Sequence, residues 1–150
     1  MLNNTIDFIK KEKYGNIHFK LQLQGKVTQV LGDNATGKSF FGKTFAAEYK
    51  DDVLYIDYMW YSYRELIPQI ISNFKGSYII FDNFDVLGGK EFESFLEMQS
   101  EKDDKIYIIF SRDFLAFVPL YNVCVMKHYT VKNSNGINEV LYVLDYTKKG

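Results

Sequence analysis

The chain has only one cysteine, Cys124, among its 150 residues, so it cannot form an intrachain disulfide bond. This cysteine lies in the apolar segment 122–126, which has the pattern of a strand and predicts a buried, unreactive thiol. The sequence also lacks an apolar run approaching about eighteen residues and a signal-peptide pattern. These absences predict a soluble, cytoplasmic protein without a membrane partner.

The sequence has no excess of charge of either sign, since its formal net charge at pH 7 is -1. A broad electrostatic attraction to nucleic acid is therefore not indicated. The densest basic cluster is Lys10, Lys11 and Lys13, which Glu12 interrupts, and we expect it to be a solvated helix face. With 47% hydrophobic and 25% charged residues, the composition is that of an ordinary globular protein, and the length fits one domain, 1–150.

Residues 32–39 read GDNATGKS and match the phosphate-binding pattern GxxxxGK[ST]. In this pattern glycines allow the backbone N–H groups to approach phosphate oxygens. The lysine then carries its charge to the β- and γ-phosphates, and the serine hydroxyl binds Mg²⁺. The expected ligands are ATP or ADP and Mg²⁺. The residues predicted to bind the nucleotide are Gly32, Asp33, Asn34, Ala35, Thr36, Gly37, Lys38, Ser39 and Phe40.

The neighbouring segments support this interpretation. An apolar, β-branched run at 26–31 predicts a strand, and 38–50 has apolar residues at helical spacing. A helix that begins at the loop directs its dipole and unpaired N–H groups toward an anion. Farther along, the apolar strand 78–81 leads directly to Asp82, whose carboxylate is expected to hold the Mg²⁺ shell beside Ser39.

Strands and helices alternate along the rest of the sequence. Further strands are predicted at 16–23, 51–58 and 104–110, and helices at 62–74 and 90–100. We expect 16–23 to pair with 26–31 as an N-terminal hairpin, and the turn sequence 133–136 to join a C-terminal hairpin. The predicted fold class is α/β: three layers around a mainly parallel sheet, with antiparallel additions at both ends.

Residues 16–112 resemble the P-loop NTPase superfamily, in the branch that has a strand between the phosphate-loop strand and the Asp82 strand. The opening through GDNATGKS resembles the Walker A region of ABC-type and SMC-like ATPases. The segment IIFDNFDVLGGKEFESFLE and the later IYIIFSRD resemble the Walker B and sensor-1 regions of AAA+ proteins. The resemblance implies a three-layer P-loop fold, with Asp82 as the Walker B aspartate and Ser111 as the polar residue that touches the γ-phosphate or the attacking water.

The sequence departs from these families after Asp82. Both usually have a glutamate there that orients water, whereas this chain has Asn83, whose amide can position water but cannot accept its proton. Asp85 and Asp57 are the two acids that could replace the missing glutamate, although a loop or capping aspartate is the favoured interpretation of each. There is also no LSGGQ-like signature, and no helical lid follows residue 112.

Two functions are consistent with these features. The first is an ATP-binding protein with slow or partner-dependent Mg²⁺-ATP hydrolysis, in which Lys38 also assists the reaction. The second is a degenerate, non-hydrolysing regulatory or interaction module. A protein partner or a homo-oligomer is expected, through 58–63 or through the C-terminal hairpin, where Tyr142, Leu144 and Tyr146 share one face. Alternatively, these residues complete the core of the monomer.

Overall fold

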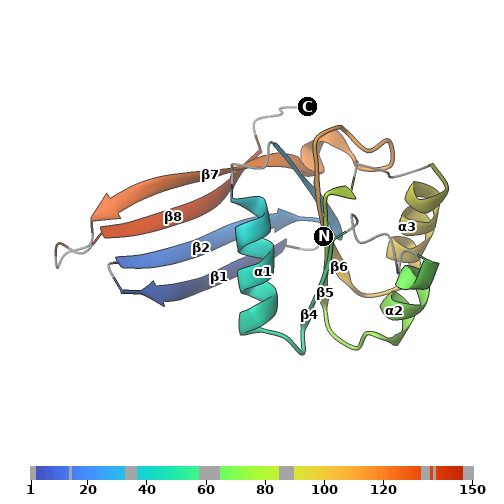
Figure 1. Ribbon diagram of the computed structural model, residues 1–150. Coiled ribbons are helices and arrows are strands. Elements are labelled where there is room, and N and C mark those ends of the chain that lie inside the picture. The colour runs from blue at the N-terminus through green and yellow to red at the C-terminus, as the bar shows by residue number, and fades with distance from the viewer. Residues whose placement is uncertain are drawn as a thin grey trace.

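The computed structural model describes residues 3–13, 15–32, 37–57, 65–84, 90–132, 136 and 138–146. Its elements follow in chain order, with a short 3-10 helix, η4 (Leu120–Asn122), before the last two strands: β1 (Asn3–Glu12), β2 (Gly15–Gln24), β3 (Val27–Leu31), α1 (Lys38–Glu48), β4 (Val53–Asp57), α2 (Ile67–Asn73), β5 (Tyr78–Asp82), α3 (Lys90–Lys102), β6 (Ile106–Ser111), β7 (Val123–Lys132) and β8 (Asn138–Asp145). The strands form one sheet in the order β1-β2-β8-β7-β3-β6-β5-β4 (Figure 1).

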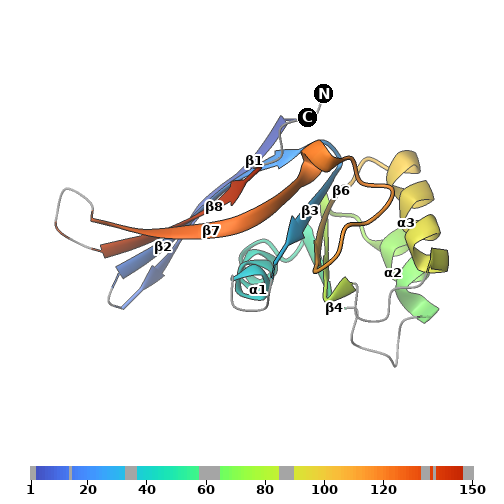
Figure 2. The ribbon, with the colours of Figure 1, turned by 90° about the horizontal axis from the view of Figure 1, so that it is seen from above.

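Four short strands, β3, β6, β5 and β4, are parallel to their neighbours and form one half of the sheet. Helix α1 lies on one side of these strands, and α2 and α3 lie on the other (Figure 2). Successive strand residues point to opposite faces, so Ile80 and Ile108 pack in the core on the α1 side, while Ile79 and Ile109 pack with α2 and α3.

The other half of the sheet consists of two long antiparallel hairpins. β1 pairs with β2 and β7 pairs with β8, while a parallel contact between β2 and β8 joins the two hairpins. The sheet curls, and α1 lies on its concave side (Figure 2). Phe8 and Phe19 from the first hairpin are buried there against Phe41 and Phe45 of α1. Helix α1 therefore joins the two halves.

The predicted fold class, a three-layer P-loop NTPase fold with a mainly parallel sheet, is wrong. The described part of the chain is a curled, mixed sheet in which most strand residues belong to the hairpins. β1, β2 and β7 have ten residues each and β8 has eight, whereas β3 to β6 have five or six. The long strands expose much of one face, which antiparallel sheets tolerate. They are joined by hairpins and do not need the helical crossovers of a parallel sheet.

The expected pairing of 16–23 with 26–31 is also wrong. β2 pairs with β1 and β8, and β3 pairs with β6 and β7. Lys10 and Lys11 do not lie on a helix, because the buried Ile6 and Phe8 alternate with exposed residues and make 3–12 the edge strand β1.

Other local predictions are confirmed. The C-terminal hairpin pairs from Val125 with Asp145 to Lys132 with Asn138. Cys124 is buried, and burial raises the pKa of its thiol to about 12, so the thiol stays protonated.

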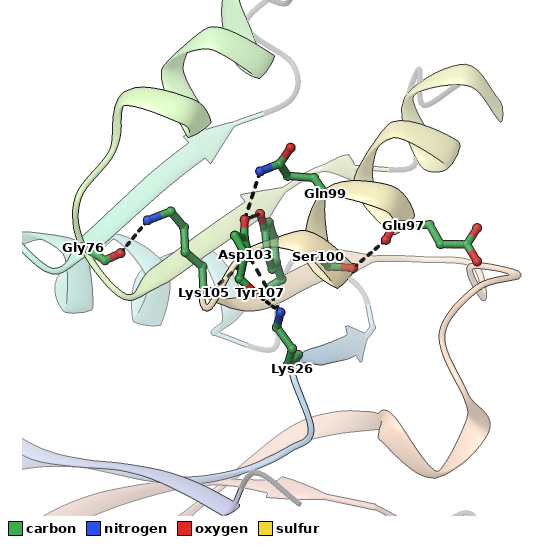
Figure 3. Close-up of polar contacts among 8 residues, drawn as sticks. All are labelled: Lys26, Gly76, Glu97, Gln99, Ser100, Asp103, Lys105 and Tyr107. Atoms are coloured by element: carbon green, nitrogen blue, oxygen red, sulfur yellow. Dashed lines mark hydrogen bonds and ion pairs between the residues drawn. The ribbon is translucent and has the colours of Figure 1, made fainter.

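A cluster of polar side chains lies around Asp103, next to the start of β6 (Figure 3). The carboxylate of Asp103 accepts hydrogen bonds from the Tyr107 hydroxyl at 2.6 Å and from Gln99 Nε2 at 3.1 Å. Lys26 Nζ donates to the Asp103 carbonyl oxygen. Burial raises the pKa of Tyr107, and the neighbouring carboxylate raises it further, so the phenol remains a donor. These contacts connect the end of α3 to β6 and to the start of β3.

Within the described ranges, no helix is both long enough and apolar enough to cross a membrane.

Candidate functional site

Several described residues that were predicted to bind or react lie where the four short parallel strands end. β3, β4, β5 and β6 end at Leu31, Asp57, Asp82 and Ser111. Asp57 is the register partner of Asp82, and Leu31 is the partner of Ser111. The carboxyl ends of parallel strands meet at one edge of a sheet, which is the usual ligand edge of such strands.

The strand predicted before the phosphate-binding pattern and the helix predicted after it are confirmed as β3 and α1. Asp33, Asn34, Ala35 and Thr36 lie outside the described residues. On either side, Gly32 (φ 136°) and Gly37 (φ 96°) have backbone conformations that favour glycine. A Cβ atom at Gly37 would also lie 2.7 Å from a ring carbon of Tyr142.

Gly37 is the N-cap of α1, and no side chain caps this helix in the part that the structure describes. The first N–H groups of an uncapped helix have no partner within the helix and carry partial positive charge. Phe40, in the same turn, is 38% exposed and has ring contacts with Phe19 and Tyr142. This end of α1 therefore suits an anion.

Lys38 folds back across the two ends of the loop. Its side chain is buried, with 5% of the residue exposed, and Nζ donates a hydrogen bond to the Gly32 carbonyl oxygen at 2.7 Å. A buried ammonium group is costly unless acceptors or negative charges surround it. The Gly32 carbonyl oxygen is one such acceptor, and a phosphate group would be a suitable negative charge for the same ammonium group.

Asp82 is 2% exposed and receives donors on both carboxylate oxygens. Ser39 Oγ donates to Oδ2 at 2.5 Å, and the Tyr55 hydroxyl donates to the same oxygen. The backbone N–H of Asn83 donates to Oδ1 at 2.9 Å. The structure therefore brings together Ser39 and Asp82, the two residues predicted to hold Mg²⁺.

Tyr55 is the site residue that the sequence analysis missed. It lies in β4, two residues before Asp57 and on the same face. Gly42 of α1 leaves room for its ring, because a Cβ atom there would lie 2.8 Å from Tyr55 Cε1. Burial raises the pKa of Tyr55, and the hydrogen bond and charge of Asp82 raise it further, so the phenol stays protonated. The sequence gives no signal for this contact, because it depends on how β4 packs against α1.

The backbone explains why an asparagine follows Asp82. Asn83 has φ 55°, a left-handed conformation in which asparagine is enriched over most other residues. Its side-chain Nδ2 donates to Asp57 Oδ1 at 3.0 Å. Asn83 thus holds Asp57, one of the two candidate bases, beside Asp82. Asp85, the other candidate, lies outside the described residues.

Ser111 is not brought next to Asp82. Its Oγ accepts a hydrogen bond from the buried Gln29 Nε2 at 2.6 Å and donates to the Asp113 carbonyl oxygen at 3.1 Å. Ser111 shares the strand face of Ile109, which packs with α2 and α3, whereas Asp82 lies on the α1 face. Its contacts in this structure stabilise the turn that follows β6.

The donors at the loop fit Mg²⁺ together with phosphate. Mg²⁺ prefers oxygen ligands and is commonly held by one or two protein groups together with phosphate oxygens. Ser39 and Asp82 supply a hydroxyl and a carboxylate. Among the residues that the structure covers, no group of three or more His, Cys, Asp or Glu could hold a metal ion on its own. A metal ion held by Ser39 and Asp82 would therefore need further ligands, such as water or phosphate oxygens.

No family model, curated protein or solved structure matches this chain.

Proposed function

We propose that the protein binds ATP or ADP together with Mg²⁺ at the loop 32–39. The observation that carries this proposal is the convergence of Lys38, Ser39 and Asp82 at the N-terminal end of α1. A buried cation, a helix N-terminus and a hydroxyl paired with a carboxylate are the groups that a Mg²⁺-bound polyphosphate needs.

Each residue has a separate role in this proposal. Lys38 would place its ammonium group against the β- and γ-phosphates, and backbone N–H groups of residues 32–40 would bind the phosphate oxygens. Ser39 and Asp82 hold the metal ion, which when bound neutralises charge on the phosphates. The same chain would lie in the cytoplasm, a reducing compartment in which the free thiol of Cys124 would persist.

We further propose that hydrolysis is slow or depends on a partner. In hydrolysis the oxygen of water bonds to the γ-phosphorus while the bond to the β–γ bridging oxygen breaks. A residue at the site orients the water and receives its proton. Asn83 cannot be that base, but it holds Asp57, whose carboxylate can be. If Asp57 does not reach the water, the protein is the alternative, a non-hydrolysing module regulated by nucleotide.

The purified chain is expected to release phosphate at well below one turnover per second. Loss of a well-placed general base costs roughly 10²–10⁴-fold, against a typical enzyme turnover of about 10 per second. Steady-state phosphate release measures this rate, and Asp57→Asn should lower it further. Asp85→Asn, made separately, tests the other carboxylate. Turnover well above one per second by the monomer would contradict the prediction.

Calorimetric titration with ADP and ATP, each with Mg²⁺ and with EDTA, tests binding itself. Saturable heat for both nucleotides supports the proposal. The absence of binding at millimolar nucleotide, in a chain that melts cooperatively, would refute it.

Association with a protein partner, or with a second copy, is also proposed. Segment 58–63 lies outside the described residues. Strand β8 is not an edge, because it pairs on both sides, and Tyr142, Leu144 and Tyr146 pack against the core. The outermost strands of the sheet are β1 and β4, and β1 exposes 48% of Ile9. An unpaired strand edge can accept another chain.

Self-association is expected to appear in sedimentation velocity as a species of twice the monomer mass, favoured when ATP and Mg²⁺ are present. Ile9→Lys, which places a charge on the edge strand, should reduce it. A strict monomer in every nucleotide state would rule out the homo-oligomer and leave a different protein as the partner.

A further inference from the structure

Tyr55 is a part of this site that the phosphate-binding pattern does not require. Its hydroxyl donates to Asp82 Oδ2, the same oxygen that receives the hydrogen bond from Ser39 Oγ. The two hydroxyls come from different elements, β4 and α1, and meet at one atom of β5.

The acceptor capacity of Asp82 is largely used by these contacts. An ionised carboxylate offers about four lone-pair positions, two on each oxygen. Ser39 and Tyr55 take the two on Oδ2, and the backbone N–H of Asn83 takes one on Oδ1. A Mg²⁺ ion that keeps several of its waters is held when those waters donate hydrogen bonds to such a carboxylate. In this site the Tyr55 hydroxyl already takes one of the acceptor positions on Oδ2.

The position of Tyr55 is fixed by packing. Its ring fits beside Gly42, where a Cβ atom would lie 2.8 Å from Cε1 and 3.1 Å from Cδ1. Phe110 lines the same space, since a Cβ atom at Gly42 would lie 3.2 Å from its Cε2. The phenol therefore reaches Asp82 because residue 42 of α1 has no side chain.

We propose that Tyr55 is a positioning residue that competes with metal-bound water for Asp82 Oδ2 and so raises the Mg²⁺ concentration that nucleotide binding needs. The inference rests on the proposed function, because it concerns the same site. A purely structural tyrosine would not affect the Mg²⁺ requirement when its hydroxyl is removed. The proposal instead predicts that removing the hydroxyl lowers the Mg²⁺ concentration needed for nucleotide binding.

The test is Tyr55→Phe, with the affinity for ADP measured by calorimetry over a series of Mg²⁺ concentrations and in EDTA. We expect the Mg²⁺ concentration for half-maximal effect to fall about tenfold, which corresponds to one hydrogen bond to a charged group. The affinity in EDTA should stay within about twofold of the original value.

Tyr78→Phe is the matched control. Tyr78 is also partly buried on the α1 face, but its hydroxyl donates to Asn4 Oδ1 at 2.8 Å and not to Asp82. It should leave the Mg²⁺ response unchanged. Gly42→Ala is a second, independent variant, because the added methyl group displaces the Tyr55 ring while the hydroxyl remains in the chain, and it should shift the response in the same direction.

An unchanged or weaker Mg²⁺ response in Tyr55→Phe, with ADP still bound, would overturn the inference and leave the proposed function standing. If neither the original chain nor Tyr55→Phe binds ADP under any condition, the proposed function fails and the inference fails with it.

Discussion

Lys38→Ala is expected to weaken the binding of Mg²⁺-ATP by about 1.5–3 kcal/mol, or roughly 10- to 150-fold, because it removes a hydrogen bond to a charged group. The side chain is buried beside Gly32 at the N-terminus of α1. The first turn of α1 itself contains no acidic residue. Calorimetry measures the change directly.

Lys43→Ala is the control for this variant, since Lys43 lies on the same helix but is exposed to solvent. It should leave the affinity unchanged. Because Lys38 also donates to the Gly32 carbonyl oxygen, the melting temperature of both variants should be recorded. Equal nucleotide affinity in Lys38→Ala and in the original chain would refute the assignment of the loop.

Phe19→Ala is expected to destabilise the fold by about 3–5 kcal/mol, the usual cost of deleting a buried phenylalanine. Phe19 is 0% exposed and has ring contacts with Phe8, Phe41 and Tyr142. It therefore connects both hairpins to α1. Urea unfolding measures the loss in free energy of unfolding. The dependence of that free energy on urea concentration should be compared between the variant and the original chain.

Phe114→Ala should change the free energy of unfolding by less than about 0.5 kcal/mol, because Phe114 is 61% exposed. A loss below about 1 kcal/mol in Phe19→Ala would mean that the hairpins do not depend on this aromatic cluster.

The local elements were largely predictable from the sequence, because they depend on neighbouring residues. The glycine loop between β3 and α1, and Asp82 at the end of β5, follow from motif spacing and from short apolar runs. The pairing of Ser39 with Asp82 was expected from the same motifs, and the two side chains lie 2.5 Å apart.

The global pairing was not predictable in the same way. Segment 15–24 has a clear alternation, but alternation defines the buried face of a strand and not its neighbour. The sequence analysis assigned it to β3, whereas it pairs with β1 and β8, and 138–145 lies far from it along the chain. The edge strand β1 was not predicted, because the lysines at 10, 11 and 13 were interpreted as a helix face. The apolar alternation that indicates the strand consists only of the buried Ile6 and Phe8.

Two features of the site depend on tertiary structure. Tyr55 reaches Asp82 only because Gly42 faces it from another element. Ser111 was expected near the γ-phosphate, but its side chain faces α2 and α3 and bonds Gln29. The face that the last residue of a strand presents depends on register, which a motif does not specify.

The pairing of β2 has a consequence for shortened versions of this protein. The segment that carries the sequence motifs, 16–112, includes β2 but excludes both of its hydrogen-bonding neighbours, β1 and β8. It also removes β7 from β3, the strand that leads into the glycine loop. A fragment with those limits would expose unpaired backbone along two strands and uncover the apolar side chains around Phe19. The motif-bearing segment is therefore not an autonomous folding unit, and biochemical work on the loop needs both hairpins in the same polypeptide.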